Sequence, residues 1–113
     1  MKYLCSSIYF FLFLQTIVFA QFDPCSLYGK VYITDDIHQA HYHVYLDNLE
    51  EEYHDLLVYE ETNILFADRG GHWYFVEDKI MANFVIYFVK QSNLAHFVIS
   101  YTDVDEFAGC NQW

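Results

Sequence analysis

The chain of 113 residues carries 16 acidic side chains against 5 lysines and arginines, which gives a formal net charge of −11. This charge repels the phosphates of nucleic acids and anionic lipids, so neither is expected as a partner. Hydrophobic residues make up 55% of the chain and aromatic residues 21%. The length and this apolar content suit one domain with one modest core.

The first twenty residues have the pattern of a secretory signal peptide. A basic start at Lys2 leads into an apolar run over residues 8–19, and the run ends at the small residue Ala20. Cleavage is therefore expected between Ala20 and Gln21. The run is too short for a committed membrane span. We expect a secreted or periplasmic protein with no membrane span once residues 1–20 are removed.

Two cysteines remain in the mature chain, one near each of its ends. Residues 21–28 form an N-terminal lead that contains Cys25, and Cys110 lies close to the C-terminus. In an oxidising compartment such a pair is expected to form one disulfide. The alternative is two buried free thiols.

A repeat of 13 to 15 residues runs through residues 29–110 and leaves residues 111–113 as a short tail. Each copy begins with an apolar pair. The pairs are Val31-Tyr32, Val44-Tyr45, Val58-Tyr59, Trp73-Tyr74, Ile86-Tyr87 and Ile99-Ser100. Eight positions after each pair the chain has Ala40, Tyr53, Ala67, Ala82, Ala95 and Ala108 in turn. Periodicity of this kind predicts an array of six similar structural units.

Within a copy, the apolar and β-branched residues predict a β-strand, and the polar residues that follow predict a turn. Strict alternation is lost in the apolar runs, so we expect strands that are buried on both faces. The alanine marks the place where the turn returns close to a neighbour. Phe84 and Phe97, two residues after an alanine, are expected to re-enter the core.

Two mainly β architectures fit the repeat: a narrow β-solenoid and a compact closed array. Six coils stacked at about 4.8 Å would place the two ends of a solenoid roughly 24 Å apart. A disulfide requires Cα atoms within about 7 Å of each other. If Cys25 and Cys110 are joined, the array must close on itself, and closure also hides the edge strands.

The repeated apolar-Tyr-x7-Ala pattern, with a last copy that ends Ala108-Gly109-Cys110, resembles the septoil-knot domain family. These are small bacterial repeat domains, often preceded by a signal peptide and formerly of unknown function. The resemblance covers about residues 29–109, and residues 73–82 and 86–95 are its best copies. It implies a compact β-rich domain with a deep seven-crossing torus knot in its backbone, and it brings no known activity. Tyr53 and Glu60 depart from the family pattern.

A histidine-rich segment is the main candidate for a metal site, because imidazoles and carboxylates close together can ligate zinc or copper. The candidate ligands are Asp35, Asp36, His38, His41 and His43. However, His96 follows an alanine just as His41 does, so a shared structural position explains both histidines. We therefore expect turn residues here, with no metal and no cofactor.

The aromatic and acidic residues leave an alternative function open, which is binding of a divalent cation or a carbohydrate. Trp73 and Trp113 are the best candidates for exposed rings that stack on a sugar. Carboxylates recur near the starts of the turns, as hard cations prefer. No serine lies in a G-x-S-x-G context and no H-E-x-x-H or P-loop is present. A small hydrolase is therefore the least favoured class, and we expect a non-catalytic, very stable, monomeric binding or structural module.

Overall fold

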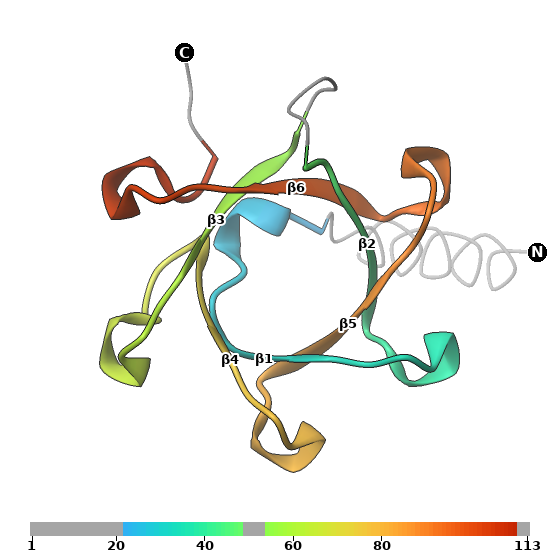
Figure 1. The fold of residues 1–113 in the computed structure, drawn as a ribbon, viewed down its shortest axis with the longest axis horizontal. Coiled ribbons are helices and arrows are strands. Elements are labelled where there is room, and N and C mark those ends of the chain that lie inside the picture. The colour runs from blue at the N-terminus through green and yellow to red at the C-terminus, as the bar shows by residue number, and fades with distance from the viewer. Residues whose placement is uncertain (1–21, 49–53, 111–113) are drawn as a thin grey trace, which may run out of the picture.

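The computed structural model describes residues 22–48 and 54–110, in which short β-strands alternate with 3-10 turns (Figure 1). The strands are β1 (Gly29–Ile33), β2 (Tyr42–Leu46), β3 (Leu56–Glu60), β4 (His72–Phe75), β5 (Phe84–Phe88) and β6 (Phe97–Tyr101). The 3-10 turns are η1 (Pro24–Ser26), η2 (Ile37–Gln39), η3 (Ile64–Phe66), η4 (Lys79–Met81), η5 (Ser92–Leu94) and η6 (Asp105–Phe107). The predicted strand-turn repeat is confirmed. The expected signal peptide, its cleavage point at Ala20 and Gln21, and the tail at 111–113 lie outside the described residues.

The strands close into an all-parallel barrel with the ring order β1, β5, β2, β6, β3, β4 and back to β1. The predicted closed array is therefore confirmed. The alternative, a narrow β-solenoid, is wrong, because β1 of the first copy pairs with β4 and β5 rather than only with the next copy. Figure 1 shows the strands as the sides of a ring, with η2 to η6 outside it and η1 within its outline in this view.

In each strand, the first residues pair with one neighbouring strand and the last residues pair with another. In β1, Gly29 to Val31 pair with β4, and Val31 to Ile33 pair with β5. The other strands follow the same rule, so each strand slants across two partners and no open edge remains among the strands that the structure describes. Closure removes the unpaired edges at which other chains could add strands.

Consecutive strands are mostly not neighbours in the ring. β5 lies between β1 and β2, and β6 lies between β2 and β3. β3 and β4 pair directly, but through only two residue pairs. The two ends of the domain enter at the starts of these strands: the carbonyl of Leu27 accepts from the N–H of Gly71, and Leu57 and Gly109 exchange backbone hydrogen bonds. The chain thus advances two places around the ring from each strand to the next, except from β3 to β4, where it advances one place and the two ends of the domain bind near the strand starts.

The core consists of the first member of each repeated pair together with a few inward residues from the strand starts. Val31, Val44, Val58, Trp73, Ile86 and Ile99 have no exposed surface. Phe84 and Phe97 join them, as predicted. Full burial of such a side chain contributes roughly 1.5 to 3 kcal/mol relative to exposure.

The tyrosines of the pairs are only partly buried and lie on the outer face of the barrel. The expectation of strands buried on both faces is therefore wrong for β1, β2 and β3, whereas consecutive buried residues do occur in β4, β5 and β6. In β1 and β3, burial alternates between buried and half-buried positions along the first four residues. The outer positions are apolar or aromatic because neighbouring rings cover them in part. One example is the edge contact of Tyr87 with His43, whose ring centroids are 6.2 Å apart.

The turns predicted from the polar residues are confirmed, and side chains cap η2, η3 and η4, whereas η5 and η6 have no side-chain cap. In η2, the carboxylate of Asp36 accepts from the N–H of His38, and the N–H of Ala40 donates to the carbonyl of Ile37. Asn63 and Asp78 cap η3 and η4 in the same way. An alanine ends every turn from η2 to η6, because the chain there passes directly onto a neighbouring strand.

Candidate functional site

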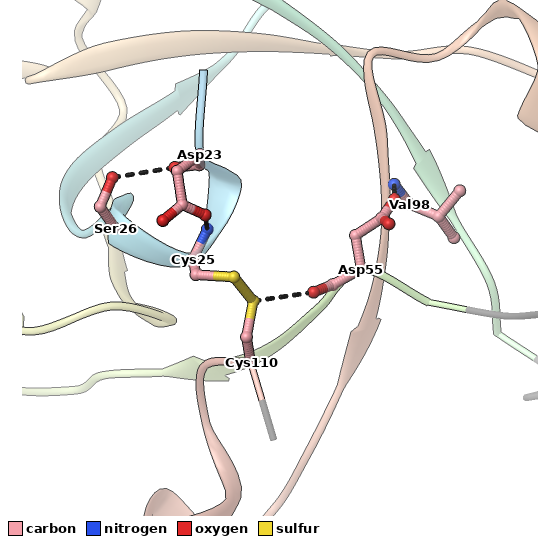
Figure 2. Close-up of a disulfide and its surroundings, with 6 residues drawn as sticks. All are labelled: Asp23, Cys25, Ser26, Asp55, Val98 and Cys110. Atoms are coloured by element: carbon pink, nitrogen blue, oxygen red, sulfur yellow. Dashed lines mark hydrogen bonds between the residues drawn. A yellow bond between two sulfur atoms is a disulfide. The ribbon is translucent and has the colours of Figure 1, made fainter. Parts of the chain in front are cut away.

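The two ends of the domain are joined by a disulfide between Cys25 and Cys110 (Figure 2). Their Cα atoms are 5.3 Å apart across a sequence separation of 85 residues. The side chain of Asp23 accepts from the N–H of Cys25, and the hydroxyl of Ser26 donates to the carbonyl of Asp23. On the other side, Sγ of Cys110 lies 2.9 Å from the carbonyl oxygen of Asp55.

This bond confirms the predicted pairing, and the alternative of two free thiols is wrong. The disulfide closes the chain from residue 25 to residue 110, which contains all six strands, into one covalent loop. A structural disulfide is consistent with an oxidising, extracytoplasmic compartment.

Residues just before four of the strands hold the neighbouring strand by two hydrogen bonds each. In each case the backbone N–H donates to the carbonyl of one residue of the neighbour, and the side chain accepts from the N–H of that same residue. All eight distances lie between 2.7 and 2.9 Å. The four strand clamps, as we name them, are His41 on Val85, Asp55 on Val98, Asn83 on Lys30 and His96 on His43.

The strand clamps explain why histidine, asparagine and aspartate occupy this place. All three side chains carry an acceptor at the δ position, one bond beyond Cγ: Nδ1, Oδ1 or Oδ2. A neutral imidazole that accepts at Nδ1 carries its proton on Nε2, so neither ring nitrogen of His41 or His96 offers a free lone pair to a metal. The positional explanation of these two histidines is thereby supported.

Of the other candidate metal ligands, His43 lies at a clamp, while Asp35, Asp36 and His38 belong to η2 and the residues just before it. His38 lies exposed in η2, and Asp36 uses a carboxylate oxygen to cap that turn. Asp35 is exposed, while the ring of His43 stacks on His96 with centroids 4.8 Å apart. In residues 22–48 and 54–110, no three His, Cys, Asp or Glu side chains come together as a metal-binding group.

Sequence reasoning missed a buried ionisable cluster on β4 and the segment after β3. Nδ1 of His72 lies 2.6 Å from Oε1 of Glu61, and the two side chains are 2% and 7% exposed. Nε of Arg69 donates to Nε2 of His72 over 3.0 Å. The ring of His72 therefore bridges a buried carboxylate and a guanidinium, with Nδ1 as the donor and Nε2 as the acceptor. No pattern in the sequence pairs Glu61 with His72, so nothing in the sequence signalled this cluster.

Trp73 is fully buried, so the expectation of an exposed ring at this position is wrong. It fills the first place of its apolar pair, where the other copies have valine or isoleucine inside the barrel. Its Nε1–H donates to the carbonyl of Leu27, which ties the N-terminal lead to β4. Stacking of Trp73 on a sugar is therefore excluded, and Trp113 lies outside the described residues.

One tyrosine has a strongly shifted titration. Burial, with a smaller contribution from the carboxylate of Glu60, raises the pKa of Tyr101 from 10.0 to about 12. Both effects disfavour the phenolate. Tyr101 ends β6 and makes an edge contact with Phe75.

The fold and the disulfide define a class: a small domain of parallel β repeats whose closed ring is locked where its ends meet. The model of the 7(1) septoil knot domain family matches residues 24–111. The chain therefore belongs to this family, as its repeat pattern predicted. No curated protein and no solved structure shows a significant match to it. Among the described residues there is no helix long and apolar enough to cross a membrane.

Proposed function

We propose that the chain is an exported, non-catalytic module whose role in binding or structure depends on resistance to unfolding. The observation that carries the proposal is the disulfide between Cys25 and Cys110, which joins the two ends of the domain where they meet in the ring. A domain inside a reducing compartment would gain nothing from this bond. The signal pattern over residues 1–20 supports export.

The topology supports resistance to unfolding. Every strand is held by two neighbours, and apart from the pairing of β3 with β4 these neighbours are not consecutive in the sequence, so no strand can leave the ring without disturbing two others. If the backbone is knotted as the family description states, unfolding of the oxidised chain cannot proceed by withdrawal of either end. In the chain-entropy model, closing a loop of this length stabilises the fold by about 4 to 5 kcal/mol.

The test compares the oxidised mature protein with the double variant Cys25→Ser/Cys110→Ser. We expect the oxidised protein to unfold in guanidinium chloride at least tenfold more slowly and to survive protease longer. Equal rates for the two proteins would refute resistance through closure. Mass spectrometry of the protein from cell fractions tests export, for which an extracytoplasmic product beginning at Gln21 is expected.

The same preparations test the alternatives. Binding of a divalent cation predicts a rise in melting temperature with millimolar calcium or zinc, whereas the proposed module predicts no change. A hydrolase would turn over generic ester, peptide or glycoside substrates in a manner that depends on the folded protein. A metal-dependent rise in melting temperature would favour a cation-binding protein over the proposed module, and turnover of a substrate would favour a hydrolase.

A further inference from the structure

The last residues of the six strands form a set at one end of the barrel. Side chains two residues apart in a strand lie on the same face, and two residues before each strand end lies the fully buried first member of a repeated pair. The six terminal side chains therefore belong to the inner face. We name this set the barrel mouth, and its members are Ile33, Leu46, Glu60, Phe75, Phe88 and Tyr101.

The members of the barrel mouth lie side by side around the barrel axis. In every pair of neighbouring strands, the last residue of one lies opposite the buried first member of the repeated pair on the other, as Phe75 does opposite Val31. Because this register is the same six times, the terminal residues lie at one height. β3 lies between β4 and β6, so Phe75 and Tyr101 flank Glu60. The two aromatic rings meet edge-on with centroids 6.4 Å apart.

Among the described residues, the barrel mouth is open to solvent. Ile33 and Tyr101 are 42% and 38% exposed, and Glu60 is exposed as well. Of the six turns, only η1 lies within the outline of the ring in Figure 1. η1 belongs to the opposite end of the barrel, because the carbonyl of Leu27 next to it accepts from the N–H of Gly71, just before β4 begins.

Glu60 is the one charged member of the barrel mouth, where the other five strands end in an apolar or aromatic residue. Its carboxylate forms no ion pair with a lysine, arginine or histidine in the part of the chain that the structure describes. It is close enough to Tyr101 to add to the effect of burial, and the two together raise the pKa of Tyr101 to about 12. An unpaired carboxylate thus lies beside two aromatic rings on an otherwise apolar surface.

The surrounding charges favour a cation over an anion. The exposed charged side chains two residues beyond a strand end are Asp35, Glu77, Lys90 and Asp103. Lys90 follows β5, which lies opposite β3 in the ring, so it is the one of these four furthest from Glu60. The other basic residues of the described chain lie elsewhere: Lys30 faces outward on β1, Lys79 is in η4, and Arg69 precedes β4. Carboxylates therefore dominate near Glu60 and attract cations.

We propose that the barrel mouth binds a small organic ammonium ion, which lies against the rings of Phe75 and Tyr101 with its charge toward the carboxylate of Glu60. Aromatic faces attract such cations, and alkyl groups on the nitrogen can contact the apolar members of the mouth. A divalent metal is not favoured, because a single carboxylate supplies too few oxygen ligands. This inference rests on the proposed function and deepens it, since it names the ligand class of a binding module.

The experiment titrates the oxidised mature protein with choline and with its neutral analogue, in which carbon replaces the ammonium nitrogen, and follows the aromatic signals by NMR. Choline should bind about tenfold more tightly than the analogue. Glu60→Gln should weaken choline binding by about tenfold, because it removes the carboxylate that faces the cation. Glu77→Gln is the matched control, since it removes the same charge from an exposed position outside the mouth and should leave the affinity nearly unchanged.

Three results would overturn the inference: choline that binds no more tightly than its analogue, a Glu60→Gln variant with the affinity of wild type, or Glu60-dependent binding to phosphatidylcholine vesicles in place of free choline. If Glu60→Gln does not fold, Tyr101 decides: Tyr101→Leu should lose about threefold in affinity, whereas Tyr101→Phe keeps the ring and the binding. Failure of the proposed function would be visible separately, as rapid unfolding or retention inside the cell, while the folded protein still prefers choline.

Discussion

Replacement of His96 tests whether the strand clamps depend on an acceptor at the δ position. His96→Ala removes the acceptor for the N–H of His43, while the backbone hydrogen bond from residue 96 to the carbonyl of His43 can remain. His96→Asn keeps an acceptor at the same distance from Cβ, as Asn83 does when it binds Lys30. The alanine variant should therefore be less stable than the asparagine variant.

The magnitude follows from the contacts of the His96 ring. One neutral hydrogen bond contributes about 0.5 to 1.5 kcal/mol. The ring also stacks on His43 at 4.8 Å and meets Tyr42 edge-on at 6.5 Å, and aromatic pairs add about 0.5 to 1.5 kcal/mol. Both variants lose the ring contacts, so their difference isolates the hydrogen bond at about 1 kcal/mol.

Thermal unfolding of the oxidised variants measures this difference. For a domain of this size, 1 kcal/mol corresponds to about 4 to 8 °C in Tm. We expect the order wild type, His96→Asn, His96→Ala, with the alanine variant lowest. Equal melting temperatures for the two variants would show that the side-chain acceptor contributes nothing and that our explanation of the histidines is mistaken.

Three further predictions concern other parts of the ring. Gly71→Ala should prevent folding to the native ring, because a Cβ on Gly71, whose φ is +84°, would lie 2.3 Å from the backbone nitrogen of Gly109; circular dichroism of the purified variant checks this. Glu61→Leu should cost about 3 kcal/mol, because it leaves the buried Nδ1–H of His72 unpaired, and Glu61→Leu/His72→Phe should recover part of this loss in chemical denaturation. The raised pKa of Tyr101 adds stability that is present below pH 10 and lost as the pH rises from 10 to about 12, so Tyr101→Phe should lose less stability than wild type between pH 9 and 12 in thermal melts.

The strands, turns and disulfide could be predicted because each depends on local or pairwise information. The phase of the repeat gives the inward residues, such as Val31 and Ile86, and two cysteines in one domain have a single way to pair within it. The ring order could not be predicted, because a repeat defines similar units but not which units pair. The strand path that places β5 between β1 and β2 depends on long-range contacts alone.

The errors about individual residues have the same origin. The position of Trp73 in the repeat was correct, but the surroundings of Trp73 and of Glu61 depend on neighbours from other copies. Trp73 is buried because the N-terminal lead covers it and accepts its hydrogen bond. Glu61 is buried because His72 pairs with it. A glutamate and a histidine eleven residues apart give no signal until β3 and β4 become neighbours.

The irregular copies of the repeat coincide with the place where the ends of the domain enter the ring. Gly70 and Gly71 form the largest insertion, and a Cβ on Gly70 would lie 1.9 Å from the carbonyl oxygen of Cys25. In the second copy, Asp55 takes the clamp position and also contacts the disulfide through its carbonyl. A side chain at position 70 or 71 would collide with the backbone of Cys25 or Gly109 and would exclude the chain ends. The departures from the pattern are therefore a requirement of closure, because at this place the ring must accommodate the two ends of the domain in addition to β3 and β4.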